Sequence, residues 1–249
     1  MLLQPDTLHK LSPKLKKTLE EYPDIALLSD SKWRLNHIYW IKDKQGNKVR
    51  FSPNWAQQEL IDDDHPCQVT LKARQLGITT FYCIKLLDAV LWNDYVHAGI
   101  IAHTLNDAQS IFVDKLKFTF DHLHPAIRAL FQTVGDSAKE LRFKHGSTIR
   151  VGTSLRSATL NYLHISELGK ICAKYPEKAR EVVSGALQTL APDQHCYIES
   201  TAEGREGFYY DLVTKSLLMK KNNQKFGPLD FKPFFFPWWK EKTYSIEEN

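Results

Sequence analysis

A short stretch near residue 75 combines basic residues, a glycine and two hydroxyl residues in an order that suits phosphate chemistry. It reads Lys72-Ala-Arg-Gln-Leu-Gly-Ile-Thr-Thr80 and lies between an apolar segment and a helix-like segment. A phosphate-binding loop needs a strand leading into a tight turn, a glycine where the backbone meets the anion, and a helix whose free N–H groups face it. Gly77 and the following helix meet these needs. Thr79 stands where a hydroxyl would hold Mg2+.

The loop departs from the common pattern G-x-x-x-x-G-K-[ST] at two positions. Lys72 replaces the first glycine, and Ile78 replaces the usual lysine. Positive charge comes instead from Lys72 at the entrance of the loop and Arg74 within it, and either can reach a β- or γ-phosphate. An ordinary strand-to-helix turn is the alternative interpretation of this segment taken alone.

Two later segments end in residues with catalytic potential. The apolar stretch 161–166 is followed directly by Glu167, and the stretch 196–199 is followed by Ser200 and Thr201. A carboxylate at the carboxyl edge of a parallel sheet is well placed to act as a base. The hydroxyl pair, by contrast, is also typical of an ordinary strand end that enters a turn.

The elements that must position these residues alternate between strand and helix patterns. Strands are expected at 68–71, 98–102, 160–165 and 196–199, and helices at 79–92 and 106–122. This alternation predicts an α/β fold with a mostly parallel central sheet flanked by helices on both faces. Hairpins are expected at 38–51 and, as an insertion, at 140–150.

The two ends of the chain have their own patterns. Residues 1–35 are expected to form helices separated by Pro13 and Pro23. Near the other end, 220–224 suggests a loop, and the aromatic run 231–239 has the composition of a core strand.

Bulk composition is that of a globular protein. With 249 residues, 43% hydrophobic and 25% charged, the chain suits one substantial α/β domain with an appendage or two small domains. The net charge of +4 tolerates a polyanionic partner without demanding one. The four cysteines form no CxxC pair, so reduced thiols are expected. We find neither a signal peptide nor an apolar run of membrane-spanning length, and therefore expect no membrane association.

The motifs together resemble those of the ATPase domain of viral large terminases. The string 73–80 is similar to their variant phosphate loop, and 51–60 resembles their adenine-recognition segment. The resemblance covers about residues 50–240 and implies a RecA-like (ASCE) P-loop NTPase fold that uses ATP and Mg2+. It implies domains at 1–50 (a small helical and hairpin appendage), 51–240 (the ATPase domain) and 241–249 (the start of a linker to a nuclease domain absent from this chain).

The resemblance also assigns roles to residues. It implies that Glu167 polarises the attacking water and Arg74 senses or stabilises the γ-phosphate, with Lys72 as a relocated lysine. Ser166 stands where the family has an aspartate and would hold a Mg2+-bound water without adding charge, so weaker metal binding is expected. The nucleotide-binding residues it implies are Gln57 (with Gln58 as the alternative), Lys72, Ala73, Arg74, Gln75, Leu76, Gly77, Ile78, Thr79 and Thr80. Thr79, Ser166 and Glu167 would serve the metal, the last two through water. Ser200 and Thr201 would couple hydrolysis to motion, and Arg156 or Arg128 would act in a neighbouring subunit.

The implied activity is ATP hydrolysis that moves double-stranded DNA into a procapsid in the host cytoplasm. The implied partners are double-stranded DNA, the portal protein of the procapsid, the small terminase subunit and further copies in a ring. Two alternatives stay open: a RecA-like helicase or translocase, and a nucleotide-binding scaffold weakened by Ile78 and Ser166. No nuclease activity is expected of this chain.

Overall fold

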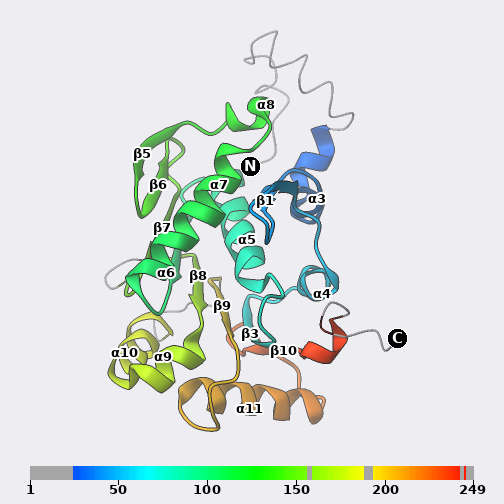
Figure 1. The fold of residues 1–249 in the computed structure, drawn as a ribbon, viewed down its shortest axis with the longest axis vertical. Coiled ribbons are helices and arrows are strands. Elements are labelled where there is room, and N and C mark those ends of the chain that lie inside the picture. Colours follow the sequence, from blue (N-terminus) through cyan, green and yellow to red (C-terminus); the bar gives the residue numbers. More distant parts are fainter. Residues whose placement is uncertain (1–24, 156–158, 188–192, 242–243, 245–249) are drawn as a thin grey trace.

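The computed structural model describes residues 25–155, 159–187, 193–241 and 244 (Figure 1). The strands are β1 (Trp40–Lys42), β2 (Lys48–Arg50), β3 (Cys67–Lys72), β4 (His97–Ile101), β5 (Thr133–Ser137), β6 (Glu140–Phe143), β7 (Thr148–Gly152), β8 (Tyr162–Ser166), β9 (His195–Ser200) and β10 (Lys232–Phe236). The helical segments are η1 (Ile25–Ser29), α3 (Ser31–His37), α4 (Trp55–Asp62), α5 (Ile78–Trp92), α6 (Leu105–Ser110), η2 (Ile111–Lys117), α7 (Phe118–Asp121), α8 (Pro125–Arg128), α9 (Leu168–Lys174), α10 (Pro176–Val182), η3 (Val183–Leu187), α11 (Phe208–Lys221) and η4 (Trp238–Lys240).

The main sheet has the order β10-β3-β9-β8-β4-β7-β6-β5. Neighbours from β10 through β7 are parallel, and β6 and β5 add an antiparallel edge. The predicted mostly parallel sheet is confirmed, as are all four predicted strands within it. The predicted inserted hairpin is β6–β7. Its second strand also joins the parallel part beside β4.

Helices cover both faces of the sheet, as predicted. Helix α5 and the continuous segment α6–η2–α7 pack on one face, while α9 and α11 pack on the other. In Figure 1, α11 lies on the opposite side of β3 and β9 from α5. Because side chains alternate along a strand, Tyr197 faces the core around α5, and Cys196 and Ile198 face the core around α9 and α11. The same alternation decides which strand residues can reach the start of α5.

The described part of the predicted appendage packs on this core. Strands β1 and β2 form the predicted antiparallel hairpin, and α3 contacts α5. Leu35, Ile38 and Tyr39 are buried in the same cluster as the α5 face of the sheet. Of the helices predicted within 1–35, the part up to residue 24 lies outside the described residues, and the part after Pro23 forms η1 and the start of α3.

Two expectations near the C-terminal end change. The loop expected at 220–224 begins later, because Lys220 and Lys221 are the last residues of α11. The aromatic run forms β10, an edge strand beside β3, where Phe234 and Phe236 are buried and Phe235 is exposed. Because successive side chains of a strand alternate between its two faces, Phe235 lies on the face opposite Phe234 and Phe236, where its side chain reaches solvent.

The four cysteines are free thiols, three of them buried, as expected. Burial raises the pKa of Cys67 to about 11, so this thiol stays protonated at neutral pH. Among the described residues, no helix is long and apolar enough to cross a membrane.

Candidate nucleotide-binding site

The predicted phosphate loop connects β3 to α5 at the carboxyl edge of the sheet. Gly77 adopts the left-handed conformation with a φ of 70° and immediately precedes the helix. Gln75 also has a positive φ, of 57°. At the loop entrance, the Ala73 amide donates to the Phe236 carbonyl of β10 at 2.8 Å. The loop is thus a tight turn anchored to the edge strand, with the first amides of α5 beyond it.

Two features disfavour any side chain at Gly77: a steric clash and the backbone conformation. Its Cβ would lie 2.6 Å from Nε2 of Gln57, and the left-handed backbone disfavours any L side chain. We expect Gly77→Ala to lower the free energy of unfolding by more than the ~1–2 kcal/mol that backbone strain costs, as measured by urea denaturation. Gly46→Ala is the matched control, because Gly46 has a φ of +84° but an open surrounding. Equal losses in the two variants would contradict the close approach of Gln57.

The predicted adenine segment touches this loop. Asn54 caps α4, and Gln57 completes the capping box by accepting from the Asn54 amide at 3.0 Å. The Gln57 side chain then donates to the Gly77 carbonyl at 2.9 Å. Gln57, Gly77 and Thr80 line one cavity of about 610 Å³. Gln58 donates instead to Asp62 of its own helix, at 2.9 Å, and it is Gln57 that contacts the loop.

Lys72 holds two carboxylates together at the end of β3. Its ammonium lies 3.0 Å from Oε1 of Glu167 and 3.1 Å from Oε2 of Glu199. Burial by itself would lower the pKa of Lys72, but the two carboxylates outweigh it and raise the pKa above its usual range. Lys72 is therefore a buried cation at the mouth of the loop.

Glu199 was not among the sequence-predicted site residues, although it lies at the centre of the cluster. It is fully buried, and its Oε1 accepts from Thr79 at 2.8 Å and from Ser166 at 2.7 Å. Burial by itself would raise the pKa of Glu199, but the Lys72 charge and the contacts with His164 and Ser166 hold the pKa well below its usual range. The group is a carboxylate at neutral pH. The one sequence signal was an acidic residue inside an otherwise apolar strand.

Glu167 is the N-cap residue just before α9 and has a strained backbone conformation, with a φ of 57°. Its Oε2 accepts from Ser200 at 3.4 Å and from Thr201 at 3.3 Å. Gly169 permits this approach, because a Cβ there would lie 2.7 Å from Oγ of Ser200. The predicted base and the predicted coupling pair are therefore in direct contact.

Solved structures similar to this chain include large terminases of bacteriophages. The ATPase domain of the Thermus phage P74-26 large terminase aligns with 76% of this chain and 83% of its own length, with a TM-score of 0.53 and 17% identity. The HK97 bacteriophage large terminase covers 86% of this chain, with a TM-score of 0.61 and 11% identity. The chain has the fold of a large terminase ATPase domain.

A third such structure is the large terminase of bacteriophage D6E in complex with ADP, with a TM-score of 0.51, 12% identity and 78% of this chain covered. The chain spans 44% of the HK97 protein and 48% of the D6E protein. No protein-family model and no curated protein matches the sequence.

Within this terminase fold, the remaining predicted residues occupy different environments. Ile78, the first residue of α5, is buried in the core, and Arg74 is exposed on the loop. Arg128 is away from the loop, with its guanidinium 3.7 Å from the centre of the Phe120 ring. Arg156 lies outside the described residues.

The donor set beside the loop fits a divalent cation that arrives with nucleotide. Thr79, Ser166 and Glu199 offer hydroxyl and carboxylate oxygens, which Mg2+ prefers. Among the described residues no group of three His, Cys, Asp or Glu side chains is arranged as a metal site.

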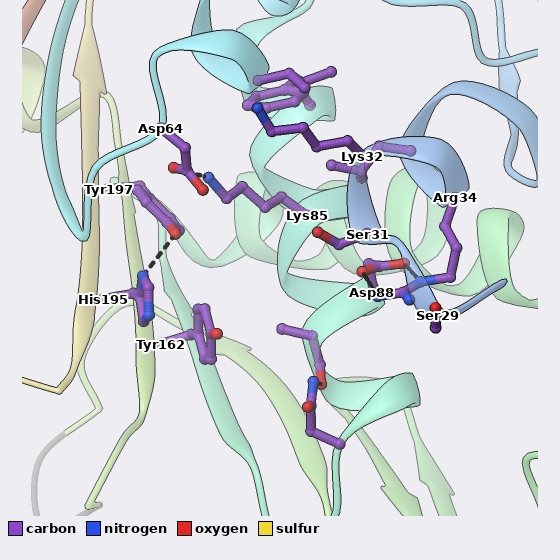
Figure 2. Close-up of a pocket in the computed structure, with 15 residues that line it drawn as sticks. Ser29, Ser31, Lys32, Arg34, Asp64, Lys85, Asp88, Tyr162, His195 and Tyr197 are labelled. Atoms are coloured by element: carbon purple, nitrogen blue, oxygen red, sulfur yellow. Dashed lines mark hydrogen bonds and ion pairs between the residues drawn. The ribbon is translucent and has the colours of Figure 1, made fainter. Parts of the chain in front are cut away.

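A second cavity, of about 320 Å³, lies at the amino ends of the central strands, opposite the phosphate loop (Figure 2). Tyr162 and His195, which line it, are the first residues of β8 and β9. Two ion pairs line it: Lys85 contacts Asp64, and Arg34 lies 2.7 Å from Asp88. Because this cavity lies at the amino ends of β8 and β9, away from the phosphate loop, the loop end of the sheet is the candidate site.

Proposed function

We propose that this chain is the ATP-hydrolysing motor domain of a viral large terminase, which uses ATP and Mg2+ to move double-stranded DNA into a procapsid. The observation that supports it most is the meeting of Lys72 and Glu167 at 3.0 Å, beside the phosphate loop. A cation for phosphate and a base for water are the two groups that phosphoryl transfer requires from the protein. The terminase fold and the loop geometry agree with this assignment.

In the proposed mechanism, nucleotide binding rearranges the charges around Lys72. The loop and the first amides of α5 bind the phosphates. The Gln57 side-chain amide binds the edge of adenine through the donor and acceptor sites that its bonds to Asn54 and Gly77 do not use. Lys72 turns from the carboxylates toward the phosphates. Glu167, which keeps Lys170 at 3.4 Å as an ion-pair partner, then accepts a proton from the attacking water. Bound Mg2+ supplies neutralisation of the phosphate charge.

We propose that the conformational change coupled to hydrolysis begins at Glu167. Ser200 and Thr201 contact Glu167, and the Tyr209 hydroxyl donates to the Ser200 carbonyl at 3.2 Å. Because Tyr209 belongs to α11, a change in the charge or position of Glu167 has a direct route to that helix. We propose this route as the coupling path to a surface that grips DNA.

The proposed assembly is a ring of copies on the portal protein of a procapsid, working with the small terminase subunit in the host cytoplasm. Arg128 or Arg156 would complete the site of a neighbouring copy. Steady-state ATP turnover with and without double-stranded DNA tests the motor assignment, and an absence of turnover in both conditions would favour a nucleotide-binding scaffold.

Arg74 and Ile78 give a paired prediction. Arg74 is exposed on the loop and carries charge, whereas Ile78 is buried and offers none to phosphate. We expect Arg74→Ala to lower turnover about a hundredfold or more, the usual effect of removing a group that stabilises transition-state charge. Ile78→Ala should lower stability through its cavity and reduce turnover per folded molecule much less. Normal turnover in Arg74→Ala would refute the role of this arginine.

A further inference from the structure

The fully buried carboxylate of Glu199 has no role in the function proposed above. It projects from β9, the strand between β3 and β8, and its backbone is in register with Thr70 on one side and Ser166 on the other. Lys72 and Ser166 share its sheet face by strand alternation. Glu199 therefore stands between the phosphate loop and the strand that leads to Glu167.

The contacts of Glu199 are those of a group that orients a metal-binding hydroxyl. In P-loop enzymes, Mg2+ is held by the hydroxyl of the loop and by an aspartate at the end of a neighbouring strand. Here the strand-end position is the neutral Ser166, and Oε1 of Glu199 accepts from both Thr79 and Ser166. The negative charge missing from β8 is supplied from β9.

The environment of the second carboxylate oxygen of Glu199, Oε2, favours binding of a cation beside it. Oε2 is buried, and the positive charge that faces it is the Lys72 ammonium at 3.1 Å. If Lys72 turns toward phosphate, the carboxylate loses its counter-charge while it remains buried. An uncompensated buried charge costs several kcal/mol, on the order of 3–5 when one partner of a buried pair is removed. A divalent cation arriving with the nucleotide would restore the balance.

We propose that Glu199 is the metal-positioning carboxylate of this site, taking the place of the aspartate that Ser166 replaces. It acts on Mg2+ through the Thr79 and Ser166 hydroxyls and through bound water. The inference rests on the proposed nucleotide-binding function and adds to it the residue that supplies the charge. It also removes the expectation that Ser166 leaves the site short of negative charge.

The test measures metal binding apart from hydrolysis. Mn2+ is titrated into the full chain with saturating ADP and followed by electron paramagnetic resonance, while ADP affinity is measured separately in EDTA. E199Q is expected to weaken Mn2+ binding by about tenfold or more, the usual effect of losing an outer-sphere metal partner. The ADP affinity of each variant in EDTA is its own baseline, because Glu199 also contacts Lys72 of the proposed phosphate site. Adding the missing aspartate, in S166D/E199Q, should restore most of the lost Mn2+ affinity.

The matched control is Asp88→Asn, which also removes a buried, cation-paired carboxylate. Asp88 lies nine residues beyond Thr79 on α5, about 13 Å along the helix, so Mn2+ affinity should not change. Where E199Q fails to fold, E199D keeps the charge but shortens its reach, and should weaken Mn2+ binding in the same way.

The possible failures are distinguishable. If the parent chain binds no ADP in EDTA and none with Mn2+, the proposed function fails and this inference fails with it. If the parent chain binds ADP and Mn2+, but E199Q or E199D binds Mn2+ as tightly as the parent, only the role of Glu199 is overturned. A weakened Mn2+ affinity that S166D does not restore would also overturn the replacement of an aspartate by Glu199.

Discussion

Glu167→Gln is expected to bind ATP normally and to hydrolyse it at least about a hundredfold more slowly, because general-base catalysis contributes about 10²–10⁴-fold. The amide preserves the size of the side chain and can still accept from Thr201. It cannot take a proton from water. ATP binding by fluorescence and turnover by phosphate release measure the two effects separately.

The control for this substitution is Glu177→Gln on α10. Glu177 is paired with Arg180 on the surface, and its side chain is 82% exposed, so neither binding nor turnover should change. Near-normal turnover in Glu167→Gln would remove this glutamate from the mechanism and leave the fold assignment untouched.

Lys72→Met should produce the largest combined loss, in stability as well as in nucleotide binding. The substitution keeps most of the side-chain volume but leaves Glu167 and Glu199 without their shared cation. Breaking a buried pair by removing one partner costs about 3–5 kcal/mol. We expect an unfolding free energy lower by this order and no measurable binding of ATP, as seen by urea denaturation and nucleotide titration.

Lys85→Met is the matched control, since Lys85 is also a largely buried lysine in an ion pair. Its partner Asp64 is 45% exposed and can be solvated when the lysine is lost, so the stability loss should be smaller. Nucleotide binding should persist. Equal stability losses in the two lysine variants, or ATP binding by Lys72→Met, would contradict the central role of Lys72.

The pKa shifts of Lys72 and Glu199 predict how the contribution of this cluster to stability depends on pH. The pKa of Lys72 is raised in the fold, so its stabilisation is complete below its ordinary pKa and is lost as pH rises through the raised value. The pKa of Glu199 is lowered, so its contribution is complete above its ordinary pKa and is lost as pH falls through the lowered value. The difference in unfolding free energy between the parent chain and Lys72→Met should therefore be flat around neutral pH and shrink toward both extremes.

Much of this fold could be predicted because short sequence segments determine its strands, helices and phosphate loop. Gly77 with its flanking strand and helix indicates a phosphate loop, since a left-handed glycine and free helix amides are properties of a short segment. The apolar strand before Glu167 similarly predicts a carboxylate at the sheet edge. Gln57 was predicted from the resemblance of 51–60 to the adenine-recognition segment of terminases, and in the structure it contacts Gly77.

Other features depend on strand order, which no local pattern contains. Glu199 is an acidic residue inside an apolar strand, and sequence alone places it in no pair. It becomes the centre of the site because β9 lies between β3 and β8, so residues 70, 166 and 199 stand in register. A buried carboxylate persists only where a cation and hydroxyl donors converge on it. That convergence comes from three strands distant in sequence, and only the tertiary structure brings them together.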